Sequence, residues 1–387
     1  MRRARKTAGQ RSRPLSAEEL YQGRVAYSKN RILRVLRGRI AVYRRELERQ
    51  VCEVGFSFKD APPEHRPEPH HMTAAIAALK AEEAIKERTL RFKGTPYVFW
   101  SLASVGTPTV EAVMERKTRA HAVFQTIEHN PALSGYHAES IHHKALTSAG
   151  QWRAVHWQGG AKIGGLGAYA LTEEGDVDLA GFHIPSGGIP FVAQVKNGRE
   201  WVYPPNDVMW DLLGAAAQLQ AVPILIARRL PEATFAFMKT VGGFAFRSIH
   251  MILHPDLATA VPLPDLPTLA EALREFGFHT DIDFITEPLP RHSELWTGAL
   301  NSEIAEMHPR FTDLTDEIMY IAYEEGLSSH RHRSGVISGA AGSEITYAFA
   351  KRVRERHREE GLARHRAQHP PDEPEPEPEP EPDYDGE

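Results

Sequence analysis

The middle of the chain alternates between helix-like and strand-like spacings of apolar residues. The stretch from Ala138 to Gly150 has the spacing of a helix that ends at a glycine. Two strand-like apolar runs flank the turn Pro185-Ser-Gly-Gly188, which predicts a β-hairpin. The run from Ala221 to Ala227 is almost wholly apolar, as is typical of an interior strand covered on both faces. A strand at residues 152–157 and a helix at Asp207–Gln220 complete a predicted α/β core.

The region before this core has a pattern of helical period. Apolar residues recur at steps of three and four from Ser28 to Val51, which predicts one amphipathic helix with arginines on its other face. The positions that set this period are Leu33, Leu36, Ile40, Tyr43 and Leu47. The composition of residues 72–93 favours a further helix, followed by an extended run at Thr95–Leu102 and a helix that starts near Thr107.

Proline-rich and strongly charged stretches mark the predicted domain boundaries. The predicted units, in chain order, are a basic disordered arm with an amphipathic helix (1–60), a Pro-rich linker (61–71), a helical region for which a winged helix is one alternative (72–135), the α/β core (136–262), a mainly helical C-terminal region (263–368) and a disordered acidic Glu-Pro tail (369–387).

Charge is distributed unevenly along the 387 residues. The net charge is −5, but the last seventeen residues contain nine acidic and no basic side chains, so the rest of the chain carries about +4. Residues 1–50 contain fifteen Lys and Arg against four Glu. This basic arm either binds a polyanion such as nucleic acid or is simply solvated.

Three features predict a cytoplasmic protein that does not enter a membrane. The chain has no run of about 18 apolar residues. The N-terminus, Met1 to Lys6, lacks the apolar stretch of a signal peptide. The single Cys52 cannot form an internal disulfide, which fits a reducing compartment.

The predicted hairpin carries polar side chains that suit a metal site. Side chains alternate between the two faces of a strand, so Gln194 and Lys196 share one face while the apolar residues between them point toward a core. Asp176 and Asp178 share a face in the same way. The hairpin therefore brings together two carboxylates, a carboxamide and an amine.

Asp178, a Gln194-x-Lys196 motif sixteen positions later and the upstream Glu139 in a helical stretch resemble the PD-(D/E)xK nuclease superfamily. Restriction endonucleases and Holliday-junction resolvases belong to this superfamily. The resemblance covers roughly residues 136–230, about a quarter of the chain. It implies a restriction endonuclease-like core, in which a central mixed β-sheet is flanked by helices in the order αβββαβ. The family usually has Glu or Asp where this chain has Gln194, so the motif is a Gln-x-Lys variant.

The resemblance also implies roles for these residues. Asp178 would be the main ligand of Mg²⁺ or Mn²⁺, with the side-chain oxygen of Gln194 and the backbone carbonyl of Val195 beside it. Lys196 would position the attacking water and stabilise negative charge. Glu139 would bind a second metal ion or orient water, and Asp176 is a reserve ligand.

The predicted function is metal-dependent cleavage of nucleic acid, with DNA favoured as the substrate and a homodimer as one possible assembly. Two other classes remain open: a catalytically inactive nucleic-acid-binding module and a helical interaction scaffold. Arg228 and Arg229 at the end of the interior strand either meet a phosphate or form a solvated strand end. His142 and His143 are expected to be exposed or hydrogen-bonded rather than metal ligands.

Overall fold

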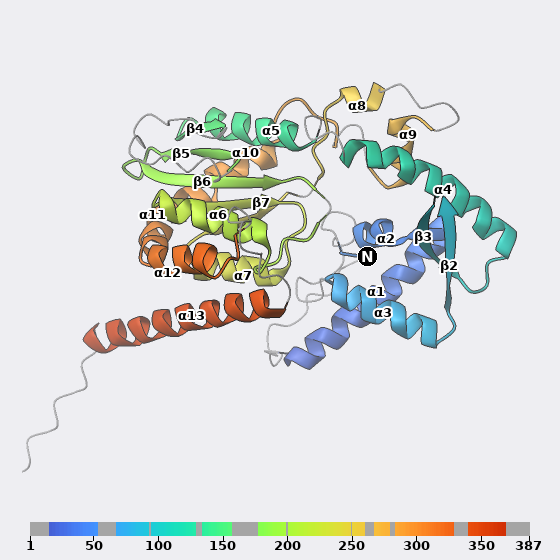
Figure 1. The fold of residues 1–387 in the computed structure, drawn as a ribbon, viewed down its shortest axis with the longest axis horizontal. Coiled ribbons are helices and arrows are strands. Elements are labelled where there is room, and N and C mark those ends of the chain that lie inside the picture. Colours follow the sequence, from blue (N-terminus) through green and yellow to red (C-terminus); the bar gives the residue numbers. More distant parts are fainter. Residues whose placement is uncertain are drawn as a thin grey trace, which may run out of the picture.

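The computed structural model describes residues 15–52, 67–92, 94–128, 134–156, 177–198, 200–248, 250–259, 267–278, 283–328 and 340–368. These residues form a mixed α/β protein with two lobes that lie side by side (Figure 1). We call residues 15–128 the N-terminal lobe and residues 134–248 with 285–368 the C-terminal lobe. The predicted basic arm up to residue 13, the Glu-Pro tail and Asp176 lie outside the described residues.

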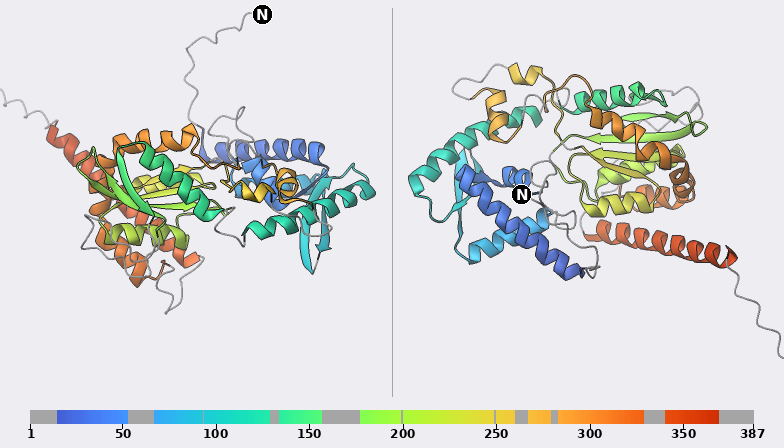
Figure 2. Two further views of the ribbon diagram at one scale, coloured as in Figure 1. Left: turned by 90° about the horizontal axis from the view of Figure 1, so that it is seen from above. Right: turned by 180° about the vertical axis from the view of Figure 1, so that it is seen from behind.

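The N-terminal lobe is built on a three-stranded antiparallel sheet in the order β1-β3-β2. Buried side chains of α1, α2 and α3 form a core on one face of the sheet, and α4 packs on the other. Figure 2 shows α1 and α4 on opposite sides of the strands. The elements are α1 (Ala17–Arg39), β1 (Ala41–Tyr43), α2 (Arg44–Cys52), α3 (Pro69–Ala81), β2 (Ile85–Phe92), β3 (Thr95–Leu102) and α4 (Thr107–Glu128).

The prediction of one helix from Ser28 to Val51 is wrong, because the helix stops at Arg39 and a second one starts at Arg44. The break is at Ile40, whose φ of 66° lies in the left-handed region that a β-branched residue rarely adopts. The three residues after it pair with β3, so strand pairing overrides the local helical period. The two helices share one core with α3, so residues 15–52 are not a unit separate from the region that follows the linker.

The predicted helix at residues 72–93 is correct only in its first half. Helix α3 starts at Pro69, within the predicted linker, and ends at Ala81. The chain then turns through Glu83, whose φ is 53°, and enters β2. All eight residues of β2 pair with β3, which accounts for a strand where the composition favours a helix. The extended run at Thr95–Leu102 and the helix from Thr107 are confirmed. The winged-helix alternative for this region remains a prediction.

The C-terminal lobe contains a five-stranded sheet in the order β4-β5-β6-β7-β8. Strands β4, β5 and β6 are antiparallel, whereas β6, β7 and β8 are parallel. The sheet elements and the helices between them are α5 (Gly135–Ser148), β4 (Trp152–His156), β5 (Leu179–His183), β6 (Ile189–Lys196), α6 (Asp207–Gln218), β7 (Val222–Ala227), α7 (Glu232–Thr240) and β8 (Phe244–Arg247). The predicted hairpin is confirmed, with Gly187 and Gly188 at positive φ in its turn.

Helices cover both faces of this sheet. Helices α5, α10 and α11 bury one face, and α6, α7, α12, η3 and α13 bury the other. All six residues of β7 are buried, which confirms an interior strand. The later helices are α8 (Asp256–Thr259), α9 (Leu269–Glu275), α10 (Pro290–Thr297), α11 (Ala299–Thr312), α12 (Thr315–Met319), the π-helix η3 (Tyr320–Glu324) and α13 (Ala340–Gln368). None of the described helices is both long and apolar enough to cross a membrane.

Contacts at residues 229–232 join the two lobes. Arg229 forms an ion pair of 3.3 Å with Glu48 of α2, and Glu232 forms one of 2.7 Å with Arg24 of α1. The backbone N–H of Glu232 also donates to Glu68, just before α3. Arg228 and Arg229 are 3% and 2% exposed, so the alternative of a solvated strand end is wrong.

Candidate functional site

A pocket of about 610 Å³ lies between the lobes and gathers four of the predicted site residues: Glu139, Asp178, Val195 and Lys196. They reach it from α5, from the residue before β5, and from the end of β6. The β5–β6 pairing places Asp178 beside the end of β6, because the backbone N–H of Asp178 donates to the Ala193 carbonyl at 3.1 Å. The predicted residues thus contribute two carboxylates and an ammonium group to the pocket, from segments that are distant in sequence.

The carboxylate of Asp178 is oriented by the neighbouring strand. Its Oδ2 atom accepts a hydrogen bond of 2.5 Å from the Val195 backbone N–H and one of 2.9 Å from the Gln194 amide nitrogen. Both donors belong to β6, the strand that carries Lys196. Since strand geometry fixes the backbone donor of Val195, the Asp178 side chain is oriented at the edge of the sheet.

Gln194 is close to Asp178 but does not line the pocket. Its side chain is 5% exposed and turns the amide nitrogen, which cannot bind a cation, toward the carboxylate. Rotating the amide by a half turn would present its oxygen there instead. In the structure, Gln194 therefore acts as a hydrogen-bond donor to Asp178, and its predicted role as a metal ligand requires the rotated amide.

Asn197 is a site residue that the sequence analysis missed. It follows Lys196, lines the pocket and is 7% exposed. Its amide nitrogen donates to the carbonyls of Ser134 and Ile252 at 2.9 and 2.5 Å, and its amide oxygen accepts from the Ile252 N–H at 2.8 Å. Because Ser134 immediately precedes α5, this side chain ties the end of β6 to the helix that carries Glu139. An Asn after a Lys has no signal that would identify this role in the sequence.

The N-terminal lobe adds charged residues to the pocket wall. Among the described lining residues, Arg45 and Glu48 of α2 come from this lobe. Arg229, which pairs with Glu48, also lines the pocket. The other charged groups in the wall are Glu200 and Asp207. The pocket is therefore mixed in charge.

The donor set of the pocket fits a hard divalent cation better than a soft one. The described residues contain no group of three or more His, Cys, Asp or Glu side chains that would hold a metal ion by themselves. Glu139 and Asp178 supply carboxylates and Val195 a backbone carbonyl. Mg²⁺ is typically held by one or two carboxylates together with water, so these residues fit Mg²⁺.

The adjacent histidines His142 and His143 of α5 do not line this pocket. His143 contacts the Ala154 carbonyl at 3.1 Å through its Nε2 atom. His142 is 1% exposed, and neither ring nitrogen has a hydrogen-bond partner among the described residues. The expectation that His142 is exposed or hydrogen-bonded is therefore wrong. Burial, followed by the nearby His292, lowers the pKa of His142 to about 3.

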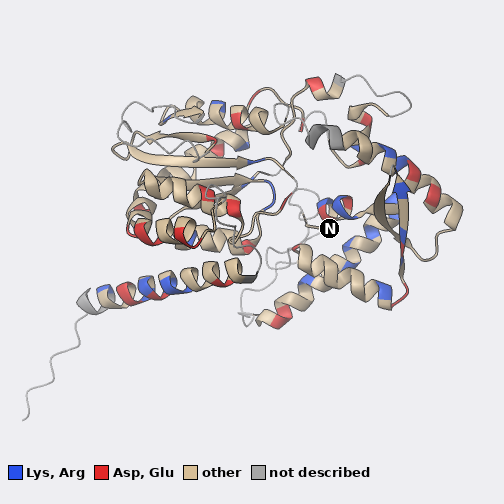
Figure 3. Ribbon diagram, in the orientation of Figure 1, with Lys and Arg blue, Asp and Glu red and all other residues tan. Residues whose placement is uncertain are grey.

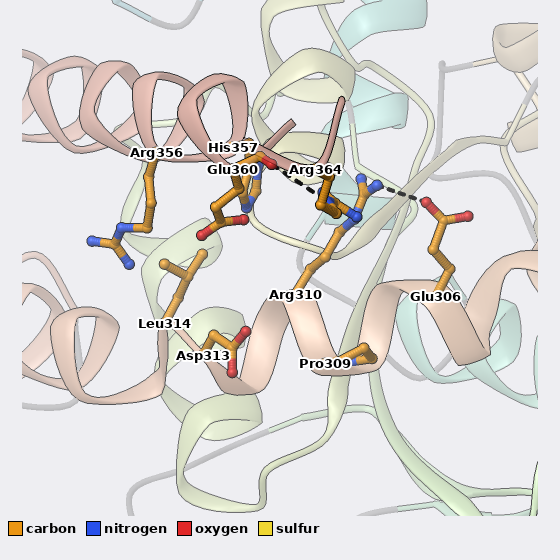
Figure 4. A pocket seen from close by; sticks show the side chains of 9 residues that line it. All are labelled: Glu306, Pro309, Arg310, Asp313, Leu314, Arg356, His357, Glu360 and Arg364. Atoms are coloured by element: carbon orange, nitrogen blue, oxygen red, sulfur yellow. Dashed lines mark hydrogen bonds and ion pairs between the residues drawn. The ribbon is translucent and has the colours of Figure 1, made fainter. Parts of the chain in front are cut away.

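A second pocket of about 500 Å³ lies between α11 and α13 and contains none of the predicted site residues (Figure 4). Opposite charges alternate in its wall, and Arg310 pairs with Glu306 at 2.6 Å. The basic segment of α13 is likewise interleaved with acidic residues (Figure 3), and its Arg352 and Arg356 both pair with Glu317. These charges are compensated within the protein, so the pocket between the lobes is the stronger candidate site.

No family model, curated protein or solved structure matches this chain.

Proposed function

We propose that the protein is a metal-dependent phosphodiesterase that cleaves nucleic acid, with DNA as the first substrate to test. The observation that carries this proposal is the convergence of Glu139, Asp178, Val195 and Lys196 on one pocket. Asp and Lys on neighbouring strands are often only an ion pair. Here the Asp178 carboxylate is instead held by donors from β6, and the carboxylate of α5 lines the same cavity.

The order of elements around the pocket supports the same proposal. Helix α5, the antiparallel strands β4, β5 and β6, helix α6 and the parallel strand β7 follow one another along the chain. This order corresponds to the αβββαβ core implied by the resemblance to PD-(D/E)xK nucleases. The position of Lys196 at the end of the third strand and of Glu139 on the first helix also agrees with it.

Each of the pocket residues would have a separate role in hydrolysis. A divalent cation, when bound, lowers the pKa of a coordinated water and offsets the charge that develops on the phosphate. Asp178 and Glu139 would hold this ion with carboxylate oxygens, and Val195 with its backbone carbonyl. Lys196 would orient the attacking water and stabilise negative charge on the phosphate oxygens. Asn197 would hold Lys196 at a fixed position relative to the start of α5.

Cleavage assays with variants test the proposal. Purified protein is incubated with plasmid, linear, single-stranded and four-way-junction DNA, in Mn²⁺ or in EDTA. Asp178→Asn keeps the size of the side chain and an oxygen acceptor but removes the charge, and Lys196→Ala removes the amine. Both should reduce cleavage at least about a hundredfold. Lys351→Ala, on the exposed side of α13, is the matched control. Wild-type cleavage by either site variant would refute the assignment.

One observation favours a second function, a nucleic-acid-binding module without catalysis. The Gln194 amide nitrogen already satisfies Asp178 where most family members have a second carboxylate. Such a module would bind DNA with a strong salt dependence but would not bind Mg²⁺ at Asp178. Calorimetric titration of Mg²⁺ and Mn²⁺ into wild type and Asp178→Asn separates the two functions. Only a protein with a functional metal site at Asp178 should show metal binding that this substitution removes.

A further inference from the structure

Helix α2 gives the N-terminal lobe a place in the candidate site. It is nine residues long and starts directly after β1. Arg45 and Glu48, which lie three residues apart on one face of this helix, line the pocket. The neighbouring Arg44 is also exposed and pairs with Glu48 at 3.2 Å, but it does not line the pocket. Of these two adjacent arginines, Arg45 lines the pocket and Arg44 does not.

Buried polar contacts fix α2 in this position. Glu46 is 1% exposed and accepts from Lys117 of α4 at 2.7 Å through both carboxylate oxygens. Glu48 pairs with Arg229 at the exit of β7, so the same helix is anchored to the C-terminal lobe. Arg45 directly precedes Glu46 in the sequence and lies three residues before Glu48. Its backbone is therefore held from both lobes while its side chain remains exposed.

We propose that Arg45 binds a backbone phosphate of the nucleic acid next to the one that is cleaved. This inference rests on the proposed function, since it takes Asp178 and Lys196 as the position of the scissile phosphate. Arg45 lines the same pocket as Asp178 and Lys196, so a chain with one phosphate at these two residues can place a neighbouring phosphate against α2. A guanidinium group is the side chain best suited to bind a phosphate, because its N–H groups match two phosphate oxygens at once. The N-terminal lobe is then part of the substrate-binding surface.

A binding experiment with matched arginines tests this role. The variants Arg45→Gln, Arg45→Lys and Arg44→Gln are made in the Asp178→Asn background. Their affinity for labelled duplex and single-stranded DNA is measured by fluorescence anisotropy. The measurements are made in EDTA over a range of salt concentrations. Arg45→Gln should weaken binding by about tenfold at low salt and lower the slope of log affinity against log salt by about one. Arg45→Lys keeps the charge but not the match to two phosphate oxygens, so its affinity should lie between those of wild type and Arg45→Gln. Arg44→Gln should change the affinity by less than about twofold.

The outcomes separate this inference from the proposed function. Equal effects of Arg45→Gln and Arg44→Gln, or no effect of Arg45→Gln, would overturn the role of Arg45 even if wild-type protein cleaves DNA. A loss specific to Arg45 in a protein that never cleaves would support the contact and refute the catalysis. Thermal melting of each variant shows that it folds. Absence of binding to any nucleic acid at low salt would overturn both.

Discussion

His142 makes the α5 side of the C-terminal lobe sensitive to acid. Its ring is buried and packs edge-on against His292, with ring centroids 5.3 Å apart. Burial is the main cause that lowers the pKa of both rings, to about 3 for His142 and about 4 for His292. In the unfolded chain both would titrate near 6.5. Below pH 6.5 the unfolded chain therefore binds more protons than the folded one.

The sign and size of the effect follow from this difference. The stabilisation by a neutral buried histidine is fully present above pH 6.5 and is lost as the pH falls toward the folded-state pKa. In this window, each histidine lowers the free energy of unfolding by up to about 1.4 kcal/mol per pH unit. Between pH 7 and pH 5, each therefore lowers it by roughly 2 kcal/mol. For His142 and His292 together, the free energy of unfolding should fall by about 4 kcal/mol.

Urea unfolding at pH 7, 6 and 5, followed by tryptophan fluorescence, measures this loss. His142→Phe keeps an aromatic ring against His292 but cannot be protonated, so it should reduce the loss between pH 7 and pH 5 by roughly 2 kcal/mol. His357→Phe, on α13, is the control for the replacement of a histidine elsewhere in the lobe. A full acid-induced loss in His142→Phe would refute the reasoning.

Two further predictions concern the site. Asn197→Ala removes three hydrogen bonds and leaves the backbone N–H and carbonyl of the buried Ile252 without this side chain as a partner. It should therefore lower the free energy of unfolding by about 2–4 kcal/mol in urea titrations and, under the proposed function, also reduce cleavage. Wild-type stability would exclude its structural role. Gln194→Glu places a second carboxylate beside Asp178 and should tighten Mg²⁺ binding by about tenfold in calorimetry. If neither wild type nor this variant binds Mg²⁺ or Mn²⁺ at millimolar concentration, residue 194 does not belong to a metal site.

The sequence was sufficient for the elements whose hydrophobic pattern is strong. The hairpin around Gly187 and Gly188, the interior strand β7 and the helix α5 follow from local spacing. Strands β1 and β2 do not, because each depends on pairing with β3 rather than on its own residues. In both β1 and β2, pairing with β3 overrides a local pattern that favours helix.

Prediction of the site was limited in a similar way. Spacing placed Asp178, Gln194 and Lys196 on one hairpin, but it could not show that the Gln194 amide nitrogen faces the carboxylate. Arg45 and Asn197 reach the pocket through the packing of distant segments, and no local pattern reports such packing. The burial of His142 could not be predicted locally, because it depends on α10, which lies about 150 residues further along the chain.

The contacts at residues 229–232 oppose separation of the two lobes. Separating them would break the Arg24–Glu232 and Arg229–Glu48 pairs and leave the buried Arg229 without this carboxylate, at a cost of several kcal/mol. A change in the width of the pocket by movement of one lobe would have to break these two ion pairs. Under the proposed function, we therefore expect bending or strand opening of the nucleic acid, rather than movement of the lobes, to bring a phosphate to Asp178. Under the proposed function, flexible, nicked or branched DNA should be a better substrate than a stiff, uninterrupted duplex.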